Sequence, residues 1–171
     1  MARIETSECL KAFFLRMYPA IDLDRVSFYD RLPFYVFWRP AAITLGRRVY
    51  FQEGKFDPCS CEGVALIAHE LFHIRQGSHS VWYYVRYAWR WLTSGFKSSR
   101  DHPMEVPAYA FQKRVREACD TVSAATGKAS PCLCQDGQSA GVDQAFIDAF
   151  FQEFAQRLMA SPASRKFLEE E

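Results

Sequence analysis

The sequence predicts an α+β fold, in which a small, largely antiparallel sheet packs on a central helix with several further helices around it. Three observations lead to this prediction. An apolar run over residues 62–77 carries two histidines and a glutamate at helical spacing. Residues 25–52 are rich in β-branched and aromatic residues and are interrupted by Asp, Pro and Gly, which is typical of short strands. Other segments repeat apolar residues with the period of an amphipathic helix.

The central helix should be buried, because residues 64–74 are apolar nearly all round apart from His69, Glu70 and His73. These three residues form an HExxH pattern. His69 and His73 stand one turn apart on the same helix face, so both imidazoles can be directed at one point. We prefer a Zn²⁺ site to two hydrogen-bonded core histidines, because buried polar groups need partners and zinc binds imidazole. Glu70 can then act on a metal-bound water without being a ligand.

Turn-forming residues mark both ends of this helix. Asp57 is predicted to cap the first turn, with Pro58 at the first helical position, where its missing N–H has no cost. Gly77 is predicted to end the helix in the left-handed conformation that glycine adopts readily.

The remaining elements follow from local patterns. Helices are expected over residues 5–18, 103–125 and 142–160, where apolar side chains recur at helical spacing. Extended runs are expected before Asp30, over Phe34–Trp38, over Ala42–Leu45 and over Arg48–Phe51. We find no linker that would divide the chain, and we expect one domain over residues 1–171.

Residues 80–96 are dense in aromatic side chains, with Arg86 and Arg90 four positions apart on one helix face. One interpretation is a helix that lies on a membrane surface or forms an aromatic wall beside a substrate. The other is a helix packed on the core with two arginines extending to solvent. We prefer the packed helix, because two basic residues are few for a membrane-binding stripe.

Composition excludes several classes of protein. The chain has 171 residues, of which 49% are apolar and 16% aromatic, as in globular proteins. The net charge of +1 gives no electrostatic signature of a nucleic-acid partner. No apolar run is long enough to span a membrane, and the N-terminus lacks the pattern of a signal peptide. We therefore expect a cytoplasmic protein, although secretion by a route without a signal peptide would leave no trace in the sequence.

Six cysteines are many for a chain of this size. Without a signal peptide, we expect reduced thiols rather than disulfides. The pairs Cys59/Cys61 and Cys132/Cys134 have a Cys-x-Cys spacing, which leaves a second, structural zinc site open. One intervening residue is fewer than the two to four typical of zinc-binding cysteines, so unligated thiols are the preferred interpretation.

The HExxH segment, together with the strand-like segment Ala42–Phe51 before it, resembles the small gluzincin-type metallopeptidase domains of bacterial proteins. The resemblance resumes at His102–Tyr109 and covers roughly half of the chain when the segment between is included. In gluzincins the third zinc ligand is a glutamate on a later helix, which implies Glu105. Many relatives carry a second acidic residue two positions further on, where this chain has Pro107.

A second placement of the third ligand competes with Glu105. His79 follows His69 by ten residues, which is the interval of the HExxHxxGxxH pattern. That pattern needs a glycine at the position of Gln76, and Gly77 comes one residue late, so we prefer Glu105. His102 could lie near the metal as a supporting residue or lie on the surface.

These residues predict a zinc-dependent peptidase. Glu70 would serve as general base and return the proton to the leaving amine. Tyr109 could donate a hydrogen bond to a developing oxyanion, or it could equally be a core tyrosine with its hydroxyl in solvent. The segment Arg48–Phe51 would hold an extended peptide or protein substrate by main-chain pairing. Two alternatives stay open: a zinc-binding scaffold or partner-binding module without catalysis, and a zinc hydrolase of a non-peptide amide or ester.

Overall fold

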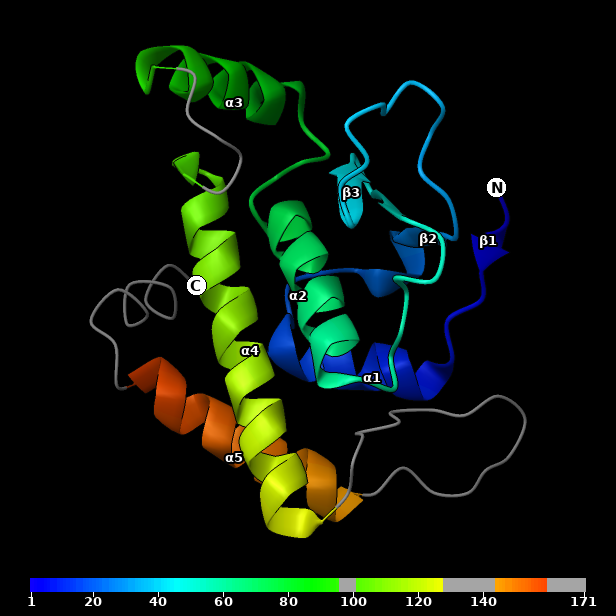
Figure 1. The fold of residues 1–171 in the computed structure, drawn as a ribbon, viewed down its shortest axis with the longest axis vertical. Helices are drawn as coiled ribbons and strands as arrows, with labels where there is room; N and C mark the ends of the chain where they lie inside the picture. The colour runs from blue at the N-terminus through cyan, green and yellow to red at the C-terminus, as the bar shows by residue number, and fades with distance from the viewer. Residues whose placement is uncertain (96–100, 128–143, 160–171) are drawn as a thin grey trace.

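The computed structural model describes residues 1–95, 101–127 and 144–159, and it confirms an α+β fold (Figure 1). The helices in these ranges are α1 (Glu8–Met17), α2 (Cys61–Arg75), α3 (Val81–Thr93), α4 (Glu105–Thr126) and α5 (Gln144–Met159), with a short 3₁₀ turn at Leu23–Arg25. The strands are β1 (Arg3–Ile4), β2 (Ser27–Tyr29), β3 (Ala42–Leu45) and β4 (Arg48–Phe51).

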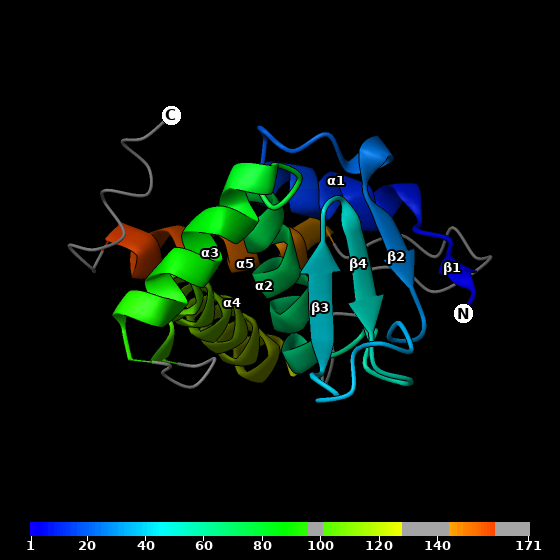
Figure 2. The same cartoon turned by 90° about the horizontal axis from the view of Figure 1, so that it is seen from above.

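The four described strands form a mixed sheet in the order β1-β2-β4-β3. β1 pairs with β2, and β3 with β4, in antiparallel fashion, whereas β2 and β4 run parallel. Val49 of β4 therefore lies opposite Phe28 on one side and Thr44 on the other. β3 is an edge strand, and it lies next to α2 (Figure 2).

The expected strand over Phe34–Trp38 is absent from the structure. This segment is a pair of turns in which Val36 N donates to Pro33 O at 2.9 Å, and Val36 alone is buried. Prolines at both ends, Pro33 and Pro40, restrict the backbone and remove donors that a sheet would need, so the aromatic residues between them project into solvent.

α2 is the centre of the packing, as predicted. Figure 1 shows it between α4 and the sheet. Ala65, Ile67, Ala68 and Leu71 have no solvent exposure, which places apolar surface on every side of the helix and accounts for its lack of a polar face. The Tyr18 hydroxyl also donates to Ala68 O at 2.6 Å, which ties α1 to the middle of α2.

The two ends of α2 differ in how well the sequence predicted them. Ser60, not Asp57, caps the first turn by accepting a hydrogen bond from Gly63 N, because Asp57 Oδ1 is used by the N–H of Cys59. A side chain at Gly63 would overlap the carbonyl of Asp57, so the tight entry into the helix requires glycine there. At the other end Gly77 has φ +89° and donates to Ile74 O, which confirms the predicted left-handed ending.

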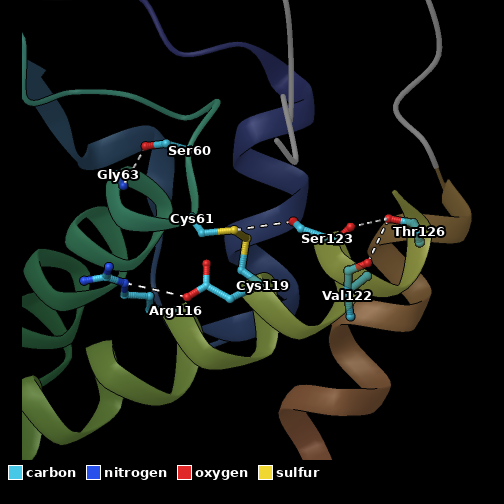
Figure 3. The surroundings of a disulfide bond; sticks show 9 residues. Ser60, Cys61, Gly63, Arg116, Cys119, Val122, Ser123 and Thr126 are labelled. Atoms are coloured by element: carbon cyan, nitrogen blue, oxygen red, sulfur yellow. Dashed lines mark hydrogen bonds and ion pairs between the residues drawn. A yellow bond between two sulfur atoms is a disulfide. The ribbon is translucent and has the colours of Figure 1, made fainter. Parts of the chain in front are cut away.

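The expectation of reduced thiols is wrong for the described cysteines, none of which is free. A disulfide joins Cys61 in the first turn of α2 to Cys119 of α4, with Cα atoms 5.5 Å apart (Figure 3). Cys9 and Cys59 are also disulfide-bonded, so the Cys59/Cys61 pair offers no thiolate to a metal. Cys132 and Cys134 lie outside the described residues. The sequence could not reveal the bond, since only the packing of α2 on α4 brings residues 58 positions apart into contact.

α3 corrects a second expectation. It is a helix as predicted, but it is not packed on the core, because Tyr83 is its only buried residue. Three tyrosine side chains on its inner side attach it to the rest of the molecule. Tyr84 Oη accepts a hydrogen bond from Gly46 N at 2.8 Å, and Tyr83 and Tyr87 reach the site described below.

Candidate metal centre

The structure brings together three of the residues that the sequence singled out. His69 and His73 project from the same face of α2, and Glu105 begins α4 and lies opposite them. The two Nε2 atoms are 3.1 Å apart, and Glu105 Oε2 lies 3.4 Å from that of His69 and 3.3 Å from that of His73. All three side chains are almost entirely removed from solvent.

These distances can be compared with those of a metal site. A tetrahedral ion with bonds of about 2.0–2.1 Å separates its ligand atoms by about 3.3 Å. The three donor atoms already form a triangle with sides of 3.1, 3.3 and 3.4 Å, so a small tetrahedral ion fits them without rearrangement of the side chains. Within the described residues, His69, His73 and Glu105 are the group of side chains that could hold a metal ion.

Glu105 is held by contacts from α3 and from the turn before α4. Its backbone N–H donates to His102 O at 2.9 Å, and Tyr87 donates to its Oε1 at 3.3 Å. Burial opposes ionisation of the carboxyl, but hydrogen bonds from His69 and His73 outweigh it and hold the pKa of Glu105 well below its usual range. The group is therefore a carboxylate, the form that can bind a cation.

His73 is oriented by two neighbours. Its Nδ1 lies 3.0 Å from Gln76 Oε1, which can only accept, so Nδ1 carries a proton and Nε2 is the nitrogen that faces the cluster and would bind a metal ion. The Tyr83 hydroxyl lies 3.1 Å from the same Nδ1. Gln76 is fixed in turn, because its amide donates to Met104 O at 3.0 Å, just before Glu105.

Electrostatics around His73 favour its charged form when no metal is bound. Burial lowers its pKa, but the hydrogen bond with Glu105, the charges of Glu70 and Glu105, and the contact with Gln76 together raise it above 6.5. The Nδ1 atom of His69 is buried without a hydrogen-bond partner among the described residues. Its ring instead packs edge-on against Tyr109, with centroids 4.6 Å apart.

Glu70 is buried and lies outside the ligand cluster. Its Oε2 accepts a hydrogen bond from Thr44 Oγ1 at 2.6 Å, which joins edge strand β3 to α2. A carboxylate fixed in this way lies beside the cluster without completing it, as a general base requires.

These groups line a cleft of about 780 Å³, within the range of small-molecule and peptide sites. One wall is β3, and the opposite wall is formed by Tyr83, Tyr84 and Tyr87 of α3. The expected role of Arg48–Phe51 in pairing with a peptide does not agree with the structure, because both edges of β4 are already paired. β3 has one unpaired edge among the described strands, and its residues line the cleft.

The other sequence candidates lie elsewhere or play another part. His79 is exposed after α2 and does not join the cluster. His102 is fully buried and stacks on Tyr87 at 3.9 Å, which supports the contact from Tyr87 to Glu105. Sequence reasoning missed Thr44, for which no local signal exists. Gln76 could have been found from its place one turn after His73 on the same helix face.

Comparison of the chain with known protein families gives one match. Residues 39–81 match the eCIS core domain. This is a zincin-like, metallopeptidase-type family, which confirms the coarser part of the expected resemblance. The matched segment contains β3, β4 and the whole of α2, including the HExxH residues, and ends before Glu105. Comparison with curated proteins and with solved structures gave no significant match.

Proposed function

We propose that the chain is a zinc-dependent metallopeptidase, with His69, His73 and Glu105 as the metal ligands. The triangle formed by their donor atoms is the observation that carries the proposal. Two imidazoles and one carboxylate at tetrahedral spacing suit zinc, whereas calcium takes six to eight oxygen ligands at about 2.3–2.6 Å. The zincin-like match over the same helix supports it.

In this mechanism the protein positions a water molecule and moves its proton. A bound zinc ion would lower the pKa of water toward neutrality and polarise a carbonyl group. Glu70 takes the proton from the water and delivers it to the leaving amine, and Thr44 keeps the carboxylate in position for both steps. Tyr109 lines the cleft beside His69 and donates a hydrogen bond to negative charge developing on the carbonyl oxygen.

The unpaired edge of β3 supports an extended peptide as substrate. Its backbone can pair with a peptide strand, which would lie along the cleft past Glu70. Alternate side chains of such a peptide would face the tyrosines of α3.

The decisive test is Glu70→Gln, which keeps the size and removes the basic charge. Zinc should remain bound at one ion per chain, while cleavage of a peptide library should fall by at least about 100-fold. Glu8→Gln, at an exposed glutamate of α1, is the matched control and should retain activity. Unchanged turnover would remove Glu70 from the mechanism. Zinc binding without cleavage by the unmodified chain would favour the scaffold, and cleavage of amides or esters alone would favour the non-peptide hydrolase.

We also propose a different compartment from the cytoplasm that the sequence led us to expect. Disulfides persist mainly where conditions are oxidising, so the bond between Cys61 and Cys119 favours such an environment over the cytoplasm expected from the sequence. None of the described helices combines the length and hydropathy that crossing a bilayer requires.

A further inference from the structure

Exposed aromatic side chains gather in two segments on either side of the cleft. On α3 the exposed large hydrophobic residues are Val81, Trp82, Tyr84, Val85, Trp89, Trp91 and Leu92. In the turns between β2 and β3 they are Phe34, Tyr35, Phe37 and Trp38. Large apolar side chains that remain in water in such numbers mark a surface that contacts something else.

On α3 four of these side chains form a stripe. Trp82, Val85, Trp89 and Leu92 are separated by three, four and three residues, so they share one helix face. The inner tyrosines hold the helix by hydrogen bonds, and therefore the stripe is directed outward by fixed contacts. The side chains of Trp82 and Trp89 are 77% and 66% exposed.

The second segment presents its aromatic residues from a turn. Phe34 is 97% and Phe37 85% exposed, while Val36 between them is buried and anchors the turn. Arg39 follows with φ 45°, a conformation that few side chains adopt, and directs the chain into Pro40. The rings pack edge-on in two pairs, Phe34 with Tyr35 and Phe37 with Trp38, and projecting pairs of this kind can insert into a deformable surface.

Both segments lie at the same end of the molecule. α3 and the connection between β2 and β3 are at the top of Figure 1, and both are in view in Figure 2, which looks from above. Trp38 lines the cleft from one segment and Tyr84 from the other, so the segments flank its mouth. A flat surface could contact both at once.

The charges beside these side chains have one sign. α3 contains Arg86 and Arg90 and no acidic residue, and Arg39 follows the projecting turn. The acids near the turn are engaged, since Asp30 accepts from Ala2 N and Glu53 pairs with Arg31. Tryptophan, tyrosine and arginine side by side suit the headgroup region of a bilayer, where rings insert and guanidinium groups meet phosphate.

We propose that α3 and residues 34–39 form a lipid-contacting surface that docks the chain on an anionic membrane, with the mouth of the cleft facing the bilayer. The positive charge selects anionic lipid. The separation of the apolar side chains into two projecting groups favours a deformable bilayer over a shaped protein partner. The proposal goes beyond the proposed peptidase activity and does not depend on it.

The chain carries its own reporter for the test. All four tryptophans, Trp38, Trp82, Trp89 and Trp91, belong to these two segments. We would titrate the full chain with vesicles of phosphatidylcholine alone and with vesicles that contain about 30% phosphatidylserine. Tryptophan emission should shift to the blue and the chain should sediment with the anionic vesicles. Both effects should weaken in about 0.5 M NaCl, where the Debye length is about 4 Å.

Substitutions would show which residues are responsible for binding to the anionic vesicles. Trp82→Ser with Trp89→Ser should lower partitioning into anionic vesicles by about tenfold or more, because both rings leave the inserted stripe. Arg90→Gln should lower it by about fivefold. Leu15→Ser on α1 and Arg116→Gln on α4 are the matched controls, since both residues are exposed and lie outside these two segments, and should bind as the unmodified chain does. Circular dichroism and metal content would establish that each variant is folded.

Two results would overturn the proposal. If neither vesicle changes the emission or sediments the chain, this surface does not bind lipid and the proposal is wrong. If the tryptophan variant partitions as tightly as the unmodified chain, or both vesicles bind equally well, the lipid contact does not use these rings or these charges.

Discussion

Thr44 Oγ1 lies 2.6 Å from Glu70 Oε2, and the same hydroxyl lies 3.1 Å from the backbone oxygen of Glu70. Both side chains are buried, so the contact is shielded from water and stronger than it would be at the surface. This hydrogen bond from edge strand β3 to α2 therefore holds in place the carboxylate that we propose as general base.

We expect Thr44→Val to lower kcat for peptide hydrolysis by about tenfold while zinc remains bound, because a loosely held base is less often in position. Thr44→Ser keeps the hydroxyl and should retain most of the activity. Steady-state kinetics with zinc content measured in parallel would check this. A valine variant with unchanged kcat would show that the hydrogen bond has no part in positioning Glu70.

The two placements of the third ligand predict opposite results. Glu105→Ala should weaken zinc binding by more than about 100-fold, because a ligand atom is lost from the cluster. His79→Ala should leave the affinity unchanged, since His79 is exposed and apart from the cluster. Competition titrations against a zinc chelator of known affinity would separate them. If His79→Ala weakened zinc binding and Glu105→Ala did not, His79 would be the third ligand.

Zinc affinity should rise with pH and reach a plateau only above pH 6.5. Zinc binds neutral imidazole, and the contacts with Glu105 and Glu70 raise the pKa of His73 against the effect of burial, so protons compete at higher pH than for an ordinary histidine. The Glu105 carboxyl does not contribute to this dependence, because its low pKa keeps it ionised throughout. Titrations between about pH 5 and pH 8 would show the curve. A midpoint at or below 6.5 would contradict the prediction.

Removal of the disulfide should destabilise the chain and loosen the metal site together. The bond between Cys61 and Cys119 closes a segment that contains His69, His73 and Glu105. Cys61→Ser with Cys119→Ser should lower the free energy of unfolding by about 2–4 kcal/mol, since the unfolded chain gains entropy.

Denaturant unfolding of the zinc-free and zinc-loaded double variant would measure that loss. Ser123→Ala is its control, because it removes the 3.6 Å contact with the Cys61 sulfur and keeps the bond. The zinc affinity of the double variant should also fall. Equal stability of the double variant and the unmodified chain would mean that the helices are held by packing alone.

Much of the site could be read from local sequence. The spacing of His69 and His73 places both on one face of any helix, and the apolar residues around them require that this helix be buried. Gly77 ends the helix where glycine is needed. The single domain over residues 1–171 remains a prediction of the same kind.

Other features needed the folded chain. Glu105 was implied by a family resemblance, and only the packing of α4 against α2 brings its carboxylate to 3.3 Å from His73. The aromatic residues of 34–38 fit a strand by composition, yet Pro33 and Pro40 and the burial of Val36 make them a projecting turn.

The sequence by itself determined the helix that presents two imidazoles and a glutamate, because periodicity along a chain dictates which side chains share a face. Tertiary structure alone decided the contact from Thr44 to Glu70, the bond from Cys61 to Cys119 and the outward stripe of α3. These depend on how separate elements pack, and residues far apart in sequence leave no local pattern to show that they meet.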